Sequence, residues 1–255
     1  RHCSEATSSL DAFDIQTQVR LVFGQGAVKS VGKHAARLGG RRVLLVTDEG
    51  IVRAGHAAKA IEHLQSAGLE VATFASVREN PNTADVDLCV EAARDHKTNL
   101  LVGLGGGSSM DTAKGCNFIF TNGGKMQDYW GIGKAPHPML PLIAIPTTAG
   151  TGSECQSFAL IADEKTHQKM ACGDSKAAAA VAILDPELTL SQPRKVSACT
   201  GIDALSHAIE SGVSLKRNAF SWMHSQEATK CILPGLERVL THPDDLEARG
   251  QLLLG

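Results

Sequence analysis

The sequence has few aromatic residues, no excess of charge of either sign and no long apolar run. Aromatic residues make up 4% of its 255 residues, and 25 Lys and Arg stand against 27 Asp and Glu, for a net charge of −2. Charges so balanced and interleaved argue against nucleic acid or a membrane surface as the main partner. A bilayer-spanning helix needs roughly 20 apolar residues, and no run comes near that length. We therefore expect no nucleic-acid partner and no membrane partner.

The cysteines lack the pattern of a disulfide framework and of a C-x-x-C motif. There are seven, an odd number, scattered from Cys3 to Cys231. Such usage is typical of a reducing compartment, where cysteine serves as a small core residue. Residues 1–10 have no apolar core, so they do not resemble a secretory signal. We expect a cytoplasmic protein, with an organelle matrix as the alternative.

The sequence does contain a regular alternation of strand-like and helix-like segments, and its 43% hydrophobic residues are enough for one large or two modest domains. Apolar residues at helical spacing predict helices over 27–38, 54–67 and 83–97, and a further helix from Ser108. Short apolar or alternating runs predict strands at 19–23, 42–47, 70–74, 100–102, 141–146, 157–162 and 180–184. This order predicts a parallel sheet covered on both faces, in a Rossmann-like α/β domain.

The pattern changes after Asp185 and Pro186. From residue 187 onward the sequence predicts helices only, over 193–211, 218–232 and 244–254. We therefore expect an α/β domain over residues 1–186 and an all-α domain over residues 187–255.

The most informative stretch leads from the strand at 100–102 into the helix that begins near Ser108. Glycines at positions 103, 105, 106 and 107 separate the two. Glycine tolerates positive φ and leaves room for a ligand beside the backbone, and a helix N-terminus favours an anion. The stretch predicts a phosphate-binding turn, and the alternative is a plain tight turn between a strand and a helix. Ser108 stands where G-x-G-x-x-G would place its third glycine, so the standard dinucleotide motif is not met.

Two further features follow predicted strands at their carboxyl ends, where open α/β sheets bind ligands. The segment PTTAGTGSE at 146–154 has hydroxyls and glycines that suit phosphate or ribose oxygens. Alternatively, it is a loop whose hydroxyls satisfy its own backbone. Asp48 can accept both ribose hydroxyls of an adenosine and would repel a 2′-phosphate, which favours NAD over NADP. Asp48 is equally well explained as a helix N-cap.

The predicted helix over 193–211 carries Asp203 and His207, an i, i+4 pair. At that spacing both side chains leave one face of the helix. A carboxylate and an imidazole placed in this way can share a divalent metal ion. The alternative is an ordinary surface or capping pair, because D-x-x-x-H is a common pattern.

Three long motifs in this order resemble those of the iron-containing (group III) alcohol dehydrogenase family. They are GGGSSMDTAK at 105–114, PTTAGTGSE at 146–154 and GIDALSHAIE at 201–210, and the resemblance extends along the chain from about residue 15. It implies a dinucleotide-binding α/β domain, a helical domain for metal and substrate, and a small alcohol or aldehyde as substrate.

The resemblance also implies roles for single residues. Asp203 and His207 match two of the protein ligands of a catalytic divalent ion, usually Fe²⁺ and sometimes Zn²⁺. The residues expected to contact NAD are Asp48, Asn80, Gly105, Gly106, Gly107, Ser108, Asp111, Thr147, Thr148, Thr151, Ser153 and Lys169. The family further suggests a homodimer formed through the first strand.

The sequence departs from the family after His207. The family takes two more histidine ligands from further along the helical domain, whereas here only His224 and His242 follow, neither in a matching context. We therefore expect the helical domain, and with it the metal site, to be incomplete in these residues.

The expected reaction is hydride transfer between a small alcohol and NAD. One alternative is a metal- and NAD-dependent lyase resembling dehydroquinate synthase, although the 146–154 motif follows the dehydrogenase pattern. Another alternative is an NAD-binding fragment without catalytic activity.

Overall fold

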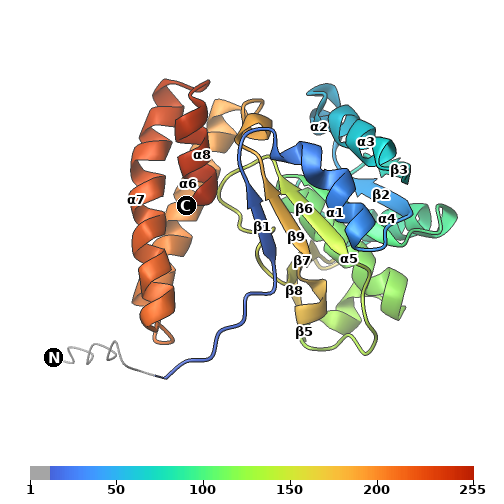
Figure 1. The fold of residues 1–255 in the computed structure, drawn as a ribbon. Helices are drawn as coiled ribbons and strands as arrows, with labels where there is room; N and C mark the ends of the chain where they lie inside the picture. Colours follow the sequence, from blue (N-terminus) through green and yellow to red (C-terminus); the bar gives the residue numbers. More distant parts are fainter. Residues whose placement is uncertain (1–11) are drawn as a thin grey trace. The chain divides into compact units, whose positions relative to one another are not determined.

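The computed structural model describes residues 12–255, and its main sheet confirms the predicted parallel α/β fold (Figure 1). Six strands within these residues lie in the order β1-β9-β6-β4-β2-β3, and every neighbouring pair is parallel. They are β1 (Arg20–Phe23), β2 (Arg42–Val46), β3 (Glu70–Phe74), β4 (Leu100–Gly105), β6 (Leu142–Pro146) and β9 (Val181–Leu184). The direction of winding reverses at β2, because the chain moves from β2 to the edge strand β3 and then returns to β4 on the other side of β2.

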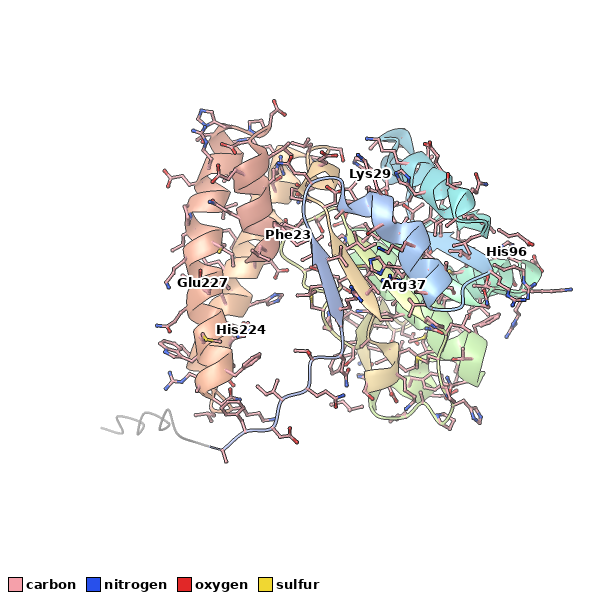
Figure 2. The ribbon with its side chains drawn as sticks, in the orientation of Figure 1. Phe23, Lys29, Arg37, His96, His224 and Glu227 are labelled. Carbon is pink, nitrogen blue, oxygen red and sulfur yellow. The ribbon has the colours of Figure 1, made fainter. Side chains whose placement is uncertain are left out.

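The strand β1 forms one edge of this sheet. Among the described strands it pairs only with β9, in a register that runs from Arg20 opposite Val181 to Phe23 opposite Leu184. The side chains of Leu21 and Phe23 are exposed, and Phe23 is labelled on this strand in Figure 2. An edge strand with exposed apolar side chains can accept a further strand.

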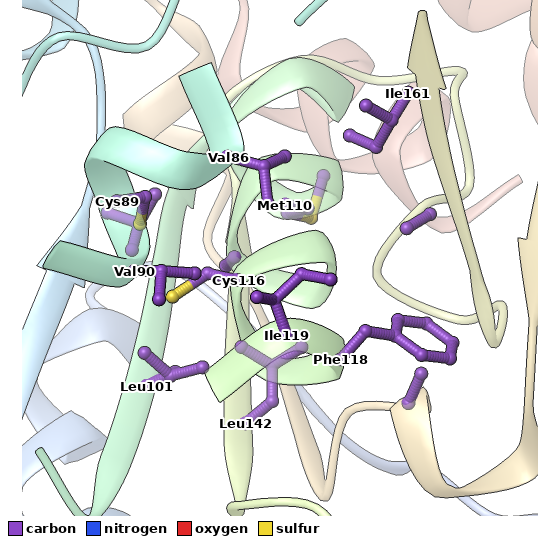
Figure 3. Packing of buried hydrophobic residues seen from close by; sticks show 14 of the residues in the cluster. Val86, Cys89, Val90, Leu101, Met110, Cys116, Phe118, Ile119, Leu142 and Ile161 are labelled. Atoms are coloured by element: carbon purple, nitrogen blue, oxygen red, sulfur yellow. The ribbon is translucent and has the colours of Figure 1, made fainter. Parts of the chain in front are cut away.

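Helices cover both faces of the sheet, as its near-continuous apolar strands predict. They are η1 (Ala27–Ser30, a 3₁₀ helix), α1 (Val31–Arg37), α2 (Glu49–Arg53), α3 (His56–Ser66), α4 (Thr83–Asp95) and α5 (Gly107–Asn122). Alternate residues of β2 enter different cores: Val43 and Leu45 cluster with residues of α1 and α3, whereas Leu44 and Val46 cluster with residues of α4 and α5. Figure 3 shows side chains of this second cluster.

The structure also contains short elements that the apolar pattern does not predict. The helix α2 begins directly after Asp48, ahead of the predicted helix. The strand β8 (Lys169–Gly173) lies in a polar segment and pairs antiparallel with β7 (Phe158–Ala162). With β5 (Gly131–Ile132) these two strands form a second sheet in the order β5-β8-β7. Such short elements carry too little periodicity to be recognised without their partners. Three further 3₁₀ helices are η2 (Met126–Tyr129), η3 (Ser175–Ala177) and η4 (Pro186–Thr189).

The described chain divides into two compact units. The α/β unit comprises residues 18–147 and 152–191, and the helical unit contains residues 148–151 and 192–255. The helices of the second unit are α6 (Arg194–Val213), α7 (Ala219–Thr241) and α8 (Leu246–Leu254), and α7 contacts both of the others. No helix within residues 12–255 is long and apolar enough to cross a membrane.

The helix α7 runs through Pro234 to Thr241, so the predicted end at residue 232 is wrong. Proline inside a helix removes one backbone hydrogen bond and costs about 3 kcal/mol. On both sides of Pro234 the helix buries apolar side chains, including Ile232, Leu236 and Val239. Burial of these side chains offsets the cost of the proline, because each contributes about 1.5 to 3 kcal/mol.

A short loop packs tightly against α6 within the helical unit. Gly150, in this loop, has a φ of +143°, which is a glycine conformation. A Cβ added at Gly150 would lie 1.8 Å from the backbone oxygen of Thr200 on α6. The loop can therefore approach the helix only because position 150 has no side chain.

Asp185 joins the beginning and the end of the α/β unit. Its carboxylate is fully buried after β9 and accepts hydrogen bonds from the backbone N–H groups of Gly26, Val28 and Glu187, each 3.1 Å long. Gly26 and Val28 lie at the start of η1, which follows β1, and Glu187 lies in η4. One side chain thus satisfies backbone donors from both ends of the unit.

We predict that the substitution Asp185→Ala lowers the free energy of unfolding by about 2 to 4 kcal/mol, because it leaves several backbone N–H groups without an acceptor. Urea denaturation followed by circular dichroism would measure the change. The control is Asp95→Ala, at an exposed acid on α4, which should stay within about 0.5 kcal/mol of the parent. Equal stability of the two variants would contradict the role given to Asp185.

We also predict that Gly150→Ala destabilises the protein by about 3 kcal/mol or more, because both its φ and its contact with Thr200 oppose a side chain. Gly152→Ala is a matched control. Gly152 also has a positive φ, +62°, but an added Cβ there would meet no atom within 4 Å. Gly152→Ala should lower the free energy of unfolding by about 1 to 2 kcal/mol, the cost of placing a side chain on a left-handed backbone. Thermal unfolding that shows the same loss for both variants would refute the close contact.

Candidate functional site

The sheet reverses its direction of winding at β2, and the carboxyl ends of the neighbouring parallel strands β2 and β4 lie at the same edge. Open α/β sheets bind ligands at such a point, because the connections on its two sides lead away in opposite directions. Asp48 follows β2, and Gly105 ends β4 and leads into α5. The structure therefore brings together two features that lie far apart in the sequence.

The glycine-rich turn at this edge has the geometry of an anion-binding site. Gly106 occupies the N-cap position of α5, and no side chain caps the first turn of the helix. Backbone N–H groups at a helix N-terminus that lack intrahelical acceptors are available to a phosphate, which the helix dipole also favours. Gly107 and Ser108 follow in this first turn. The turn therefore offers uncapped backbone donors suited to a phosphate group, and pyrophosphate binding there stays a prediction.

Gly105 allows the close approach of three structural elements. Its φ is +148°, and a Cβ there would lie 2.4 Å from the hydroxyl of Ser109 and 3.3 Å from Oδ2 of Asp48. The backbone oxygen of Gly105 also accepts a hydrogen bond of 2.9 Å from the N–H of Thr147. The turn, the acid after β2 and the start of the 146–154 motif therefore meet at a residue that must be small.

The two carboxylate oxygens of Asp48 have different surroundings. Its Oδ1 atom accepts a 3.0 Å hydrogen bond from the N–H of Ile51, so it caps α2 as the structural alternative predicts. Its Oδ2 atom points to the space next to Gly105. The cap therefore holds the carboxylate in place beside the turn, with one oxygen directed at the candidate site.

Asn80 lies beside the same turn. Its φ of 54° is in the left-handed region, which asparagine adopts more readily than most residues. Its backbone N–H donates to the Ser108 hydroxyl at 3.3 Å. The segment after β3 thereby reaches the beginning of α5, and Asn80 lies next to Ser108.

The threonines of the 146–154 motif divide between the two units. Thr147 is buried in the α/β unit, whereas Thr148 and Thr151 belong to the loop that clusters with the helical unit. The buried hydroxyl oxygen of Thr148 has no hydrogen-bond partner among the described residues. An unpaired buried hydroxyl is unusual in a folded protein and is expected where a ligand binds.

A buried polar cluster connects α5 with residues 153–158. The Ser153 hydroxyl donates to Oδ1 of Asp111 at 2.7 Å, and both residues are buried. The ammonium group of Lys114, which is 0% exposed, donates to the carbonyl oxygen and the hydroxyl of Ser153 and to the carbonyl oxygen of Phe158. Glu154 is also buried, and its Oε2 atom has no hydrogen-bond partner among the described residues.

Burial dominates the protonation of this cluster. It raises the pKa of Asp111 and of Glu154, and it lowers the pKa of Lys114 to about 8. The charge of Lys114 partly opposes the shifts of both carboxyls, and the exposed Lys169 on β8 adds a weaker effect on Asp111. Of the predicted cofactor contacts, Lys169 therefore acts electrostatically on Asp111.

Asp203 and His207 lie on one face of α6, as their spacing predicts. Oδ1 of Asp203 is 3.7 Å from Nε2 of His207, and the side chains are 48% and 52% exposed. A carboxylate oxygen and an imidazole nitrogen are suitable donors for Fe²⁺ or Zn²⁺. Residues 12–255 contain no cluster of three or more His, Cys, Asp or Glu that could hold a metal ion. The pair therefore fits two ligands of a metal site and not a complete set.

Lys114 and Glu154 are not among the site residues predicted from the sequence. Both lie inside the recognised motifs, and both are charged residues next to apolar or small neighbours. The sequence does contain one signal of a buried cluster. Lys114 follows Asp111 by three residues, on a helix that comes directly after a buried strand.

Family models match both parts of the chain. The model described as iron-containing alcohol dehydrogenase matches residues 18–186, and the model for the C-terminal part of the Fe-containing alcohol dehydrogenase family matches residues 197–255. The NAD-dependent methanol dehydrogenase of Bacillus methanolicus is 38% identical over 89% of this chain and 60% of its own length. The choline dehydrogenase of Bacillus subtilis (strain 168) is 41% identical over 96% of this chain and 61% of its own length.

Solved structures show the same fold. A 1,3-propanediol oxidoreductase superposes with a TM-score of 0.92 at 32% identity, over 96% of this chain and 64% of the other. The sulfoacetaldehyde reductase of Bifidobacterium kashiwanohense, in complex with NAD⁺, superposes with a TM-score of 0.87 at 32% identity, over 95% of this chain and 64% of the other. The chain spans about three fifths of the length of the curated relatives it matches. Since the two family models together cover most of its residues, the chain belongs to the iron-containing alcohol dehydrogenase family.

Proposed function

We propose that the complete gene product is an NAD-dependent oxidoreductase that transfers a hydride between a small alcohol and NAD with the help of a divalent metal ion. The observation that carries this proposal is the meeting of Asp48, Gly105 and Thr147 at the point where the winding of the sheet reverses. Family membership and the NAD⁺ complex of a similar structure support it.

In this proposal the glycine turn and Ser108 bind the pyrophosphate through backbone N–H groups and a hydroxyl. Asp48 accepts hydrogen bonds from the ribose hydroxyls, and its charge disfavours a 2′-phosphate, so NAD is preferred over NADP. The remaining contacts to the dinucleotide come from Asn80, Asp111, Thr147, Thr148, Thr151, Ser153 and Lys169.

Asp203 and His207 would hold the metal ion through one oxygen and one nitrogen atom. Fe²⁺ is the proposed metal and Zn²⁺ the alternative. When bound, the ion would act as a Lewis acid toward the oxygen of the substrate. Because residues 12–255 offer only this pair, we propose that these residues by themselves bind NAD without metal-dependent turnover.

The substrate class follows from the relatives. Methanol, choline and 1,3-propanediol appear in the names of similar dehydrogenases, and sulfoacetaldehyde in that of a reductase. We propose a small alcohol or the corresponding aldehyde for this chain. We also place the boundary between the dinucleotide-binding and helical parts near residue 186, which the limits of the two family models support.

Two further proposals concern the setting of the protein. The open edge and the exposed apolar residues of β1 support a homodimer formed through this strand. The described cysteines, from Cys89 to Cys231, are all free thiols, which supports a reducing compartment such as the cytoplasm.

We predict that Asp48→Asn weakens NADH binding about tenfold and reduces the preference for NADH over NADPH, since the acceptor charge is lost. Asparagine is also a good N-cap, so α2 should be retained. Fluorescence titration with both nucleotides would measure the change, and Asp95→Asn serves as the control. An unchanged ratio of the two affinities would exclude Asp48 from the ribose site.

We further predict that Asp203→Asn and His207→Ala, made in the complete gene product, each reduce turnover about a hundredfold or more, because even indirect partners of a metal ligand affect metal affinity by 10- to 100-fold. Formation of NADH would be followed with NAD, Fe²⁺ or Zn²⁺ and a panel of small alcohols and diols. His224→Ala on α7 is the matched exposed control. No turnover by the parent protein with any alcohol would overturn the oxidoreductase proposal.

A further inference from the structure

Lys114 is a fully buried charged residue of the α/β unit, and the proposed function gives it no role. It lies in the middle of α5 and is 0% exposed. Its ammonium group is 2.5 Å from the carbonyl oxygen of Ser153, 3.0 Å from the Ser153 hydroxyl and 3.1 Å from the carbonyl oxygen of Phe158. An ammonium group has three N–H donors, and here each has one acceptor.

These three bonds connect residues that are far apart in the sequence. Ser153 and Phe158 lie about 40 residues after Lys114, on either side of a segment with no helix or strand between residues 153 and 157. The Ser153 hydroxyl in turn donates to Asp111, one turn before Lys114 on α5. Lys114 therefore binds both ends of the segment, and through Ser153 it acts on the carboxylate of Asp111.

We propose that Lys114 is a positioning residue of the dinucleotide site, whose ammonium group holds residues 153–158 against α5 so that Ser153 and Asp111 keep the arrangement that receives the cofactor. This inference rests on the proposed NAD site. A neutral amine has only two N–H donors, and its lone pair would face an oxygen atom. The charged form is therefore the one that holds the segment.

The surroundings of Lys114 set the pH range in which its amine is charged and can hold the segment. Burial lowers its pKa to about 8, and the carboxylates of Asp111 and Glu154 partly oppose that shift. The neighbouring thiol of Cys155 stays neutral in this range, because burial raises its pKa to about 12. The neighbouring elements α4 and β7 present apolar side chains at this point of α5, where a Cβ at Gly115 would contact Val86 and Ile161. NADH affinity should accordingly be constant near pH 7 and decrease above about pH 8.

A decrease in affinity over this range would not reflect unfolding. The pKa of Lys114 is lower in the folded chain than the ordinary value of about 10.4 that a lysine has when unfolded. Between about pH 8 and pH 10.4 the unfolded chain binds more protons than the folded chain. The contribution of Lys114 to the free energy of unfolding therefore rises with pH in this range. Affinity and this contribution to stability should change in opposite directions.

The test uses the 255-residue chain and NADH as the probe, titrated by fluorescence between about pH 7 and pH 9.5. We expect Lys114→Met to bind NADH about tenfold more weakly at pH 7 and to lack the decrease above pH 8. Ser153→Ala keeps both carbonyl acceptors of Lys114, so it should bind more weakly than the parent but retain the decrease. Lys59→Met, at an exposed lysine on α3, should match the parent throughout.

A second measurement does not depend on the nucleotide. Hydrogen exchange of residues 153–158, compared at one pH without NADH, should be faster in Lys114→Met and unchanged in Lys59→Met. Unchanged exchange, or a parent affinity without a decrease above pH 8, would overturn the role of Lys114 while leaving the NAD site intact. Absence of NADH binding by the parent would instead overturn the proposed function, and the positioning role with it.

Discussion

The close approach of three chain segments at Gly105 is the constraint on which the candidate site depends. A side chain there would overlap the Ser109 hydroxyl and crowd the carboxylate of Asp48, and the backbone conformation is itself one that glycine favours. Without this approach the acid after β2 and the N-terminus of α5 could not face the same space. The site thus rests on the absence of a side chain, at the place where the sheet changes its direction of winding.

Charge burial in the α/β unit follows from the same geometry. The helix α5 begins at the edge that carries the candidate site and continues into the core, so its residues pass from half-buried at 107–108 to buried from Ser109 onward. Asp111 and Lys114 are buried without a direct ion pair between them, and the Ser153 hydroxyl lies between the two. Buried charges are costly unless every donor and acceptor is satisfied, so this cluster is more informative about function than an equal number of surface charges.

The helical unit combines a closely packed loop with the exposed pair Asp203 and His207. Gly150 brings the loop of residues 148–151 into contact with α6, and α6 also carries Asp203 and His207. The loop follows the strand β6 in the chain but clusters with the helices. Part of the 146–154 motif therefore belongs to the α/β unit and part to the unit that carries Asp203 and His207.

The sequence by itself determined the parallel α/β fold, the helical C-terminal part and the glycine-rich turn, because apolar periodicity and short-range spacing are properties of single elements. It also placed Asp203 and His207 on one helical face, which requires only the period of a helix. Only the tertiary structure decided that Asp48 both caps α2 and faces Gly105, that Lys114 binds Ser153, and that β8 exists. Each of these depends on contacts between residues far apart in the chain, which the order of strands in the sheet creates and which a single sequence does not encode locally.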